Sequence, residues 1–241
     1  ISPNATLLSP FQLYASNGST LHSFSDKNQA LHFSALPHLG FSYAFGAQGA
    51  QRLKVDFQEA FRHGLLLNLS FDKTKGNGFL RNDAFSFQQF NGELLRTGKQ
   101  YSMDLRFSKE AIDRSWSNGL FDSISMSGIA LDLQTVRKEN ARSMQSLSAL
   151  RFQQRFDFNQ DSTIGFGLLT RHAFYEYKRD YQEVGDLTQQ YSNVYWNSDS
   201  TQDRFRERFL SNDAGVFMDV SAVQLQSTLG YHLRQWHDQQ S

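Results

Sequence analysis

Hydrophobic and polar residues alternate along much of this chain, and the pattern is clearest in residues 41–71. Leu53, Val55 and Phe57 are separated by charged residues, and the alternation continues through 65–71 after a short break. Successive side chains of a β-strand point to opposite sides, so a period of two predicts strands. Each strand would have one face of hydrocarbon and aromatic rings and one face of charged, polar or small side chains.

The same period recurs farther along the chain and predicts a series of strands. These strands are expected at 38–46, 50–60, 65–73, 83–95, 99–109, 145–158, 162–178, 214–222 and 225–234, and 28–34 is a candidate first strand. Residues 1–24 contain two of the three prolines and show no lasting period, which predicts an irregular N-terminal arm. The chain therefore divides into this arm and a β-region at 25–241.

The alternation changes phase within two of the predicted strands. In 83–95, Phe85 and Phe87 share one face whereas Phe90 lies on the other. A β-bulge is the simplest explanation, because one extra residue moves every later side chain to the opposite face. A similar slip occurs in 162–178, where the alternative is that the outer half of the strand leaves the apolar layer.

The connections between the predicted strands alternate in length. Short breaks are expected near 61–64, 96–98, 159–161 and 223–224, and long loops at 74–82, 110–144 and 179–213. The tight turn at 46–49 is the exception, because it falls on the long-loop side. Short turns at one end and long loops at the other are typical of membrane barrels, whereas a β-sandwich has no reason to sort loops by end. The strand-like segment 124–133 would form a hairpin above the barrel or fold into its lumen.

The predicted fold class is therefore all-β, an antiparallel transmembrane β-barrel of which this chain holds an incomplete portion with about 9–10 strands. A mean hydropathy of −0.54 and the lack of a long apolar run exclude membrane helices and leave membrane strands open. The start at Ile1 and the end just after a strand-like run predict a mature chain truncated on its C-terminal side.

Composition also narrows the range of functions. The 24 basic and 24 acidic side chains give no net charge, which argues against a nucleic-acid partner. Because the chain has no cysteine, disulfide frameworks and cysteine-based zinc sites are excluded. The seven histidines are dispersed, and no nucleophile elbow or phosphate-binding loop occurs. We predict no catalytic residues, metal site or cofactor. Gly165 and Gly167 are interpreted as small residues facing a crowded wall.

Two sets of residues are candidates for function, one on each face of the predicted strands. The pore-lining set is Arg52, Lys54, Asp56, Asn68, Asp72, Asp104, Arg106, Arg151, Arg155 and Asp157. The lipid-facing set is Leu53, Val55, Phe57, Leu65, Leu67, Leu69, Tyr101, Met103, Leu105 and Phe107. The charged residues would compensate one another across strands, line an aqueous lumen, or do both. Lys54 and His232, which lack an evident partner in the sequence, favour a wet lumen.

Aromatic residues near the predicted strand ends suggest the girdles that flank the apolar band of a membrane barrel. The residues concerned are Phe45, Phe61, Phe71, Phe107, Tyr175 and Tyr177.

Several motifs resemble the porin family of Bacteroidota outer membranes. They are a strand ending G-x-Q-x-x-Q (Gly46, Gln48, Gln51), a G-F-x-x-N element (Gly78, Phe79, Asn82), an Asn118-Gly119-Leu120 loop that departs from N-G-G-I, and the segments FYEYKRDYQEV and DRFRERFLSNDAGVFM. The resemblance covers roughly 36–220, and members of the family are considerably longer than this chain. It implies a barrel in the outer membrane of a Gram-negative cell, in contact with outer-membrane lipid.

Three functions are therefore weighed from the sequence. The first is a porin-like barrel that provides an aqueous path for small solutes. The second is a non-conducting barrel that acts as a scaffold or accessory subunit of a larger secretion or uptake complex. In that case the loops at 110–144 and 179–213, with the aromatic 191–196, would contact other envelope proteins. The third and least favoured is a soluble all-β binding module or enzyme.

Overall fold

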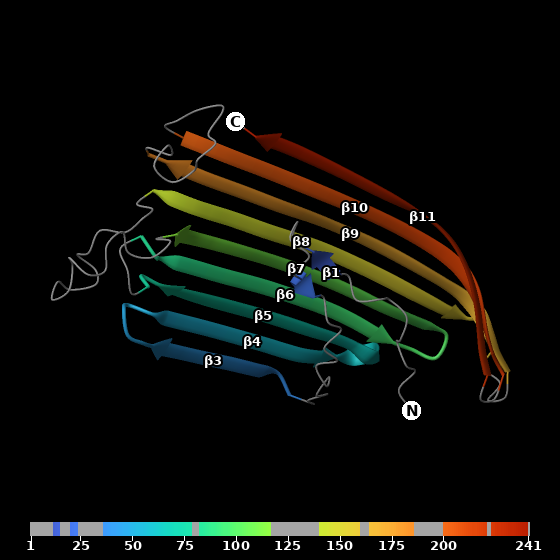
Figure 1. Cartoon of the computed structure of the whole chain (residues 1–241). Coiled ribbons are helices and arrows are strands. Elements are labelled where there is room, and N and C mark those ends of the chain that lie inside the picture. Colours follow the sequence, from blue (N-terminus) through green and yellow to red (C-terminus); the bar gives the residue numbers. More distant parts are fainter. Residues whose placement is uncertain are drawn as a thin grey trace. The chain divides into compact units, whose positions relative to one another are not determined.

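The computed structural model describes residues 12–14, 20–23, 36–78, 82–116, 140–159, 164–185, 200–220 and 223–240 (Figure 1). The chain divides into two units, Ile1–Phe33 and Ser34–Ser241. In the first unit, β1 (Gln12–Tyr14) pairs antiparallel with β2 (Thr20–Ser23). These two short strands lie within the stretch that was expected to be irregular. The predicted elements at 28–34, 124–133 and 191–196 fall outside the described residues.

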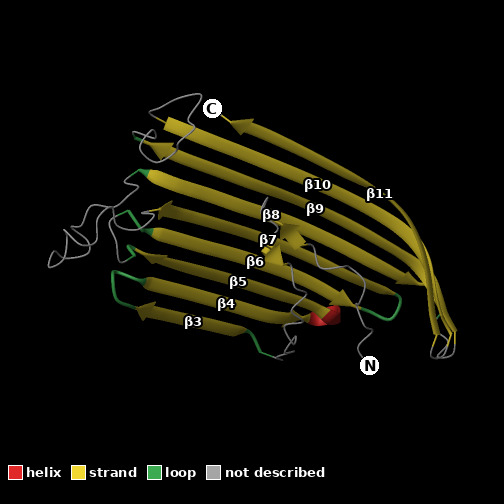
Figure 2. Ribbon diagram, in the orientation of Figure 1, coloured by secondary structure: helices red, strands yellow, loops and turns green. Residues whose placement is uncertain are grey.

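The second unit is a single sheet of nine strands in sequence order, with every neighbouring pair antiparallel. Its strands are β3 (His38–Phe45), β4 (Gln51–Phe61), β5 (Leu65–Gly76), β6 (Phe85–Thr97), β7 (Tyr101–Trp116), β8 (Ala141–Asp157), β9 (Ile164–Val184), β10 (Ser200–Val220) and β11 (Val223–Gln240). Figure 2 shows one short helical turn among the described residues, η1 (Arg62–Gly64). The predicted all-β antiparallel class is confirmed.

The strands are longer than the sequence pattern indicated, chiefly at their long-loop ends. The loop expected at 179–213 is mostly strand, since β9 continues to Val184 and β10 begins at Ser200. The loop expected at 110–144 is likewise shortened, because β7 extends to Trp116 and β8 begins at Ala141. Polar residues dominate these extensions on both faces, so the apolar alternation used to find strands is absent there.

The alternation of short and long connections is confirmed. β4 and β5 are joined by η1, in which His63 and Gly64 have φ angles of 64° and 71°. The left-handed region suits glycine, and here it reverses the chain within three residues. At the other end, the tight turn after β3 is closed by a 2.8 Å hydrogen bond from the amide of Gly46 to the carbonyl of Ala50.

The pairing register runs without a shift through β6 and β9, so the predicted bulge in 83–95 is wrong. Phe85 and Phe87 lie on the opposite side of β6 from Phe90 because the outer end of this strand carries its aromatic rings on the polar side. For the phase change in 162–178, the explanation that the outer half of the strand leaves the apolar layer is correct, because β9 has no bulge. Beyond Phe174 the side that was apolar becomes charged, starting at Glu176.

An unbroken register lets each residue be assigned to one of two faces. We call the side that carries Leu53, Leu67 and Leu105 the apolar face, and the side that carries Asn68 and Arg106 the polar face. One complete row of the apolar face crosses all nine strands. It consists of Leu39, Phe57, Leu69, Gly92, Phe107, Leu150, Phe174, Leu210 and Leu233.

Burial follows the same division. Every buried residue of the sheet lies on the polar face, namely Leu66, Gly76, Glu110, Ala141, Ser143, Leu147, Gly167, Leu169, Tyr177, Glu183, Glu207, Ser211 and Phe217. All but three of the exposed large apolar side chains in the nine strands lie on the apolar face; the three are Phe85, Trp116 and Trp236. The exposed hydrocarbon of this sheet is thus gathered on one face and its buried residues on the other.

Candidate functional surfaces

The polar face brings together every residue of the predicted pore-lining set, distributed over β4, β5, β7 and β8. The pairing register gives this result directly, because Arg52, Asn68, Asp104 and Arg155 occupy the same side of neighbouring strands. The lipid-facing set lies wholly on the other side. None of its members is buried among the described residues.

Charges on the polar face of β4 and β5 are paired. Arg52 on β4 reaches Asp72 on β5 with a 2.5 Å nitrogen–oxygen distance, and Lys54 lies 2.9 Å from Asp56 on its own strand. The interpretation of Lys54 as a lysine without a partner is therefore wrong. These are exposed pairs, whose contribution to stability is generally below about 1 kcal/mol each.

A denser network joins β5, β6 and β7. Asn68 donates a 3.1 Å hydrogen bond to Glu93, and Arg106 lies 3.0 Å from Glu93 and 2.9 Å from Asp104. Arg106 pairs directly across the sheet with Arg151 of β8. Two arginines in opposite positions repel each other, and the carboxylates of Glu93 and Asp104 beside Arg106 offset that repulsion.

A second network spans β8 to β10 and depends on Gly167 of β9, whereas Gly165 has room for a side chain. Arg155 lies 3.0 Å from Asp157 and 2.7 Å from Asp219, and its guanidinium carbon is 3.7 Å from the ring centre of Phe217. A Cβ added at Gly167 would lie 2.8 Å from the Cζ of Phe217 and 1.8 Å from a backbone oxygen. The missing side chain therefore provides the room that this crossing needs, as expected for a crowded wall.

A third group lies on the polar face of β9 to β11. The Tyr175 hydroxyl donates a 3.0 Å hydrogen bond to the buried Glu207, which also accepts one from Arg234. The ring of Phe209 stacks on Tyr175 at 5.2 Å and on His232 at 5.9 Å. His232 also lies 3.8 Å from Asp213, so the interpretation of a histidine without a partner is wrong.

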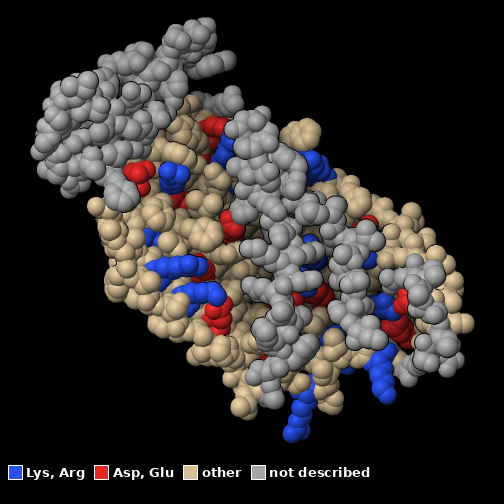
Figure 3. All heavy atoms as spheres, turned by 60° about the horizontal axis from the view of Figure 1, so that its bottom comes forward, with Lys and Arg blue, Asp and Glu red and all other residues tan. Residues whose placement is uncertain are grey.

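Sequence reasoning missed several members of these networks. Glu207 fell in the expected loop at 179–213, and Glu93 lay in the strand whose face had been misassigned by the bulge. If 83–95 had been predicted as a regular strand without a bulge, the alternation would have placed Glu93 on the same face as Asn68 and Arg106. In Figure 3, basic and acidic side chains likewise lie beside one another on the visible surface.

The aromatic residues proposed as girdles separate by face. Phe45, Phe61, Phe71 and Phe107 lie on the apolar face. Phe45 and Phe61 end β3 and β4, whereas Phe71 and Phe107 lie within β5 and β7 and not, as was predicted, near their ends. Tyr175 and Tyr177 lie on the polar face, where they bond Glu207 and Gln145, so their assignment to a girdle is wrong.

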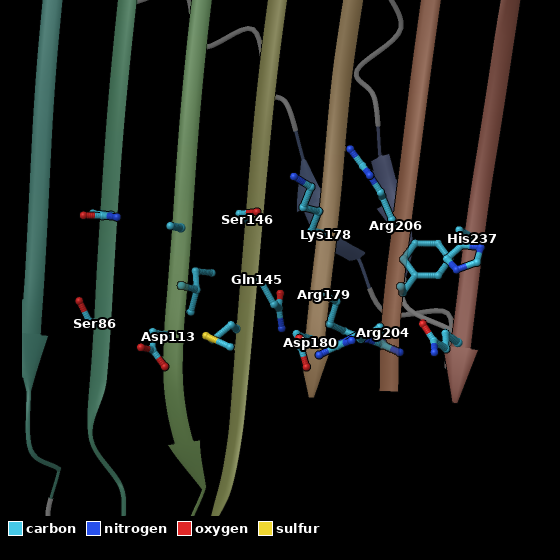
Figure 4. A pocket seen from close by; sticks show the side chains of 16 residues that line it. Ser86, Asp113, Gln145, Ser146, Lys178, Arg179, Asp180, Arg204, Arg206 and His237 are labelled. Carbon is cyan, nitrogen blue, oxygen red and sulfur yellow. Dashed lines mark hydrogen bonds and ion pairs between the residues drawn. The ribbon is translucent and has the colours of Figure 1, made fainter. Parts of the chain in front are cut away.

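The long-loop end of the apolar face is charged between β7 and β10. The Nε of Arg142 donates a 2.8 Å hydrogen bond to Asp113, and this bond is the main reason that the pKa of Asp113 is lowered from its usual value. Arg204 lies 3.3 Å from Asp180. Figure 4 shows Asp113, Asp180 and Arg204 around a hollow of about 530 Å³. The pairs lie beyond Lys109, the first charged residue on this face of β7.

Among the described residues, no group of three or more histidine, aspartate or glutamate side chains is arranged to hold a metal ion. Among the helices of the same residues, none is long and apolar enough to cross a membrane.

No family model matches the chain, and no curated protein matches it. Among solved structures, the crystal structure of the ferric citrate transporter FecA in its unliganded form is similar with a TM-score of 0.40 and 10% sequence identity. The alignment covers 84% of this chain and 33% of the FecA chain, so the chain spans about a third of that protein's length.

Proposed function

We propose that this chain forms part of a β-barrel in the outer membrane of a Gram-negative cell, and that its polar face lines an aqueous path for small solutes. One observation carries the proposal: the exposed large apolar side chains lie almost entirely on one face, and the charged networks of β4 to β8 lie on the other. Lipid on one side and water on the other is the environment in which both faces are solvated favourably.

The dimensions of the strands are consistent with this proposal. A tilted strand needs about 9–11 residues to cross a bilayer. β7 has 16 residues, β8 has 17 and β9 has 21, so each is long enough to cross and to continue beyond the lipid at its long-loop end. The change from apolar to charged side chains along the apolar face, between Phe174 and Glu176 on β9, marks where the crossing segment ends.

Closure of such a barrel would need further strands. β3 and β11 are the edges of the sheet, and eight antiparallel pairings between them leave both running in the same direction. An all-antiparallel barrel has an even number of strands, so an odd number of additional strands would complete it. The resemblance to longer porins of Bacteroidota is consistent with this requirement and supports a barrel larger than the portion in this chain.

The residues proposed to contact solutes are those of the pore-lining set, together with Glu93 and Asp219, which share its networks. Their role is electrostatic, since charges along a lumen favour or oppose ions according to sign. Planar-bilayer recordings on the full-length protein test the proposal. Reproducible conductance steps are expected, and a protein that inserts into the bilayer without conducting would overturn it.

A second candidate is a non-conducting barrel that acts as a scaffold for other envelope proteins. It is favoured by the 21-residue lengths of β9 and β10, which project a rigid sheet well beyond the length that a membrane requires. Purification of the full-length protein in mild detergent distinguishes the two functions. Stoichiometric partners together with absent conductance would favour the scaffold.

A further inference from the structure

Three basic side chains converge on one carboxylate at the long-loop end of the apolar face. Lys178 lies 2.8 Å from Glu176 on β9, and Arg208 of β10 lies 2.8 Å from the same carboxylate. The Nε of Arg206, also on β10, donates a third hydrogen bond of 2.8 Å to Glu176. We call Lys178, Arg206 and Arg208 the basic cluster.

The basic cluster carries more positive charge than its surroundings neutralise. Glu176 balances one of the three cations. The next two carboxylates on this face, Asp180 and Asp113, are each held by a different arginine, as described above. The side chains of Lys178, Arg206 and Arg208 remain 50%, 41% and 46% exposed, whereas that of Glu176 is 17% exposed. An anion that approaches this face therefore meets three accessible cations. The carboxylate of Glu176 repels it less, because the cations largely cover that group.

The depth of the cluster is set by the row of apolar residues beneath it. Glu176 and Arg208 are directly paired and lie two residues beyond Phe174 and Leu210, the last apolar pair of these strands at this end. Two residues of strand correspond to about 7 Å. The polar region on each side of a bilayer is about 5–7 Å thick. Lys178 and Arg206 leave the strands two residues farther out, and their cationic ends return to Glu176. Within the proposed membrane orientation, the charged ends of the cluster thus lie at the level of the lipid headgroups.

The chemistry of the cluster fits a phosphate group. Guanidinium groups bind phosphate oxygens through paired hydrogen bonds, and a lysine adds a compact positive charge. Figure 4 shows Lys178 and Arg206 on neighbouring strands, with both side chains extending away from the strand ends. Ser146 pairs with Lys178 across the sheet and His237 pairs with Arg206, so further polar groups flank the cluster at the same level.

We propose that Lys178, Arg206 and Arg208 bind the phosphate of an anionic lipid headgroup on the outer surface of the sheet. This inference rests on the proposed membrane barrel, because only a lipid-embedded sheet presents this face to headgroups. Basic clusters at a membrane boundary gain affinity for anionic lipid with each Lys or Arg near the surface. The bound lipid would fix the depth at which β9 and β10 leave the bilayer.

The test uses the full-length protein in nanodiscs of phosphatidylcholine with a small fraction of phosphatidic acid, with retained lipid counted by native mass spectrometry. The triple variant Lys178→Gln/Arg206→Gln/Arg208→Gln is expected to lose retention on the order of 100-fold. The control Arg142→Gln/Arg204→Gln removes two charges from the same face outside the cluster. It is expected to retain phosphatidic acid as the unaltered protein does, and titration with inorganic phosphate measures binding of the free anion.

Each outcome separates the lipid site from the membrane proposal. Failure of the unaltered protein to insert into any bilayer would overturn the proposed function and the lipid site with it. Normal insertion with equal retention of phosphatidic acid by the triple variant would overturn the lipid site alone. Equal loss in the control would show a diffuse charge effect and overturn it as well. Tight binding of free phosphate in detergent would assign the cluster to a soluble anion instead.

Discussion

The guanidinium carbon of Arg155 lies 3.7 Å from the ring centre of Phe217, although these residues belong to strands separated by all of β9. The contact exists because β9 presents Gly167 at the crossing. A cation over an aromatic ring contributes about 0.5–2 kcal/mol, depending on how well water is excluded. Arg155 is 26% exposed and has two carboxylate partners, so it holds β8 and β10 together across the intervening strand.

Substitution of Gly167 by alanine is expected to destabilise the sheet by about 1–3 kcal/mol, as for overpacking in a tightly packed region. The new Cβ would lie 2.8 Å from Phe217 and 1.8 Å from the carbonyl oxygen of Phe156, and the backbone oxygen has little freedom to move. Gly165→Ala is the matched control, because its Cβ would lie 3.7 Å from Asp219 in ordinary contact. Equilibrium unfolding of the refolded full-length protein in detergent measures both, and equal midpoints would contradict the crowding argument.

Leu67 and Asn68 provide a test of the membrane orientation, since they are adjacent on β5 and face opposite ways. If the apolar face contacts lipid, Leu67→Arg should cost roughly 2–4 kcal/mol near the middle of the bilayer. Asn68→Arg should cost much less, because it enters the polar face beside Glu93. The measurement is urea-dependent folding into lipid vesicles. Similar costs for the two variants would show that both faces meet the same environment.

The sequence predicted the strands of the apolar band well and their extensions poorly. Alternation around Leu67 and Leu105 identified which side chains share a face, because apolar and polar residues alternate strictly there. Around Glu207 and Asp113, polar residues occur on both faces of the strands. The sequence there lacks the alternation of apolar and polar residues that predicts a strand. The network partners Glu93 and Asp219 come from strands that are near in space, and only the register of the whole sheet brings them to Arg106 and Arg155.

The pairing of Asp113 with Arg142 predicts how this charged end responds to acid. Hydrogen bonding to Arg142 lowers the pKa of Asp113, so the pair should remain intact below the usual aspartate value of 3.8 and separate only as pH falls through the lowered pKa. Arg142→Gln should bring the pKa of Asp113 back toward that value. Carboxyl-carbon NMR titration of Asp113 measures this directly. Arg204→Gln should leave its titration unchanged, and an unaltered pKa in Arg142→Gln would contradict the proposed cause.

Removal of single charges on the polar face should change ion selectivity in a direction set by sign. Asp72→Asn leaves Arg52 without its carboxylate, so the lumen becomes more positive and the reversal potential in a salt gradient should shift toward anion preference. Arg52→Gln leaves Asp72 in excess and should shift it toward cations. Asp113→Asn alters the same charge on the opposite face, outside the proposed path, and should leave selectivity unchanged.

The three variants together separate a conducting polar face from a merely charged protein. A shift in Asp113→Asn equal to that of Asp72→Asn would mean that ions sense the overall charge and not the local lining. Shifts of the same sign in Asp72→Asn and Arg52→Gln would exclude both residues from the path, because opposite charge changes at one ion pair must act on passing ions in opposite directions. Opposite shifts confined to the Arg52–Asp72 pair would locate the path along the polar face of β4 and β5.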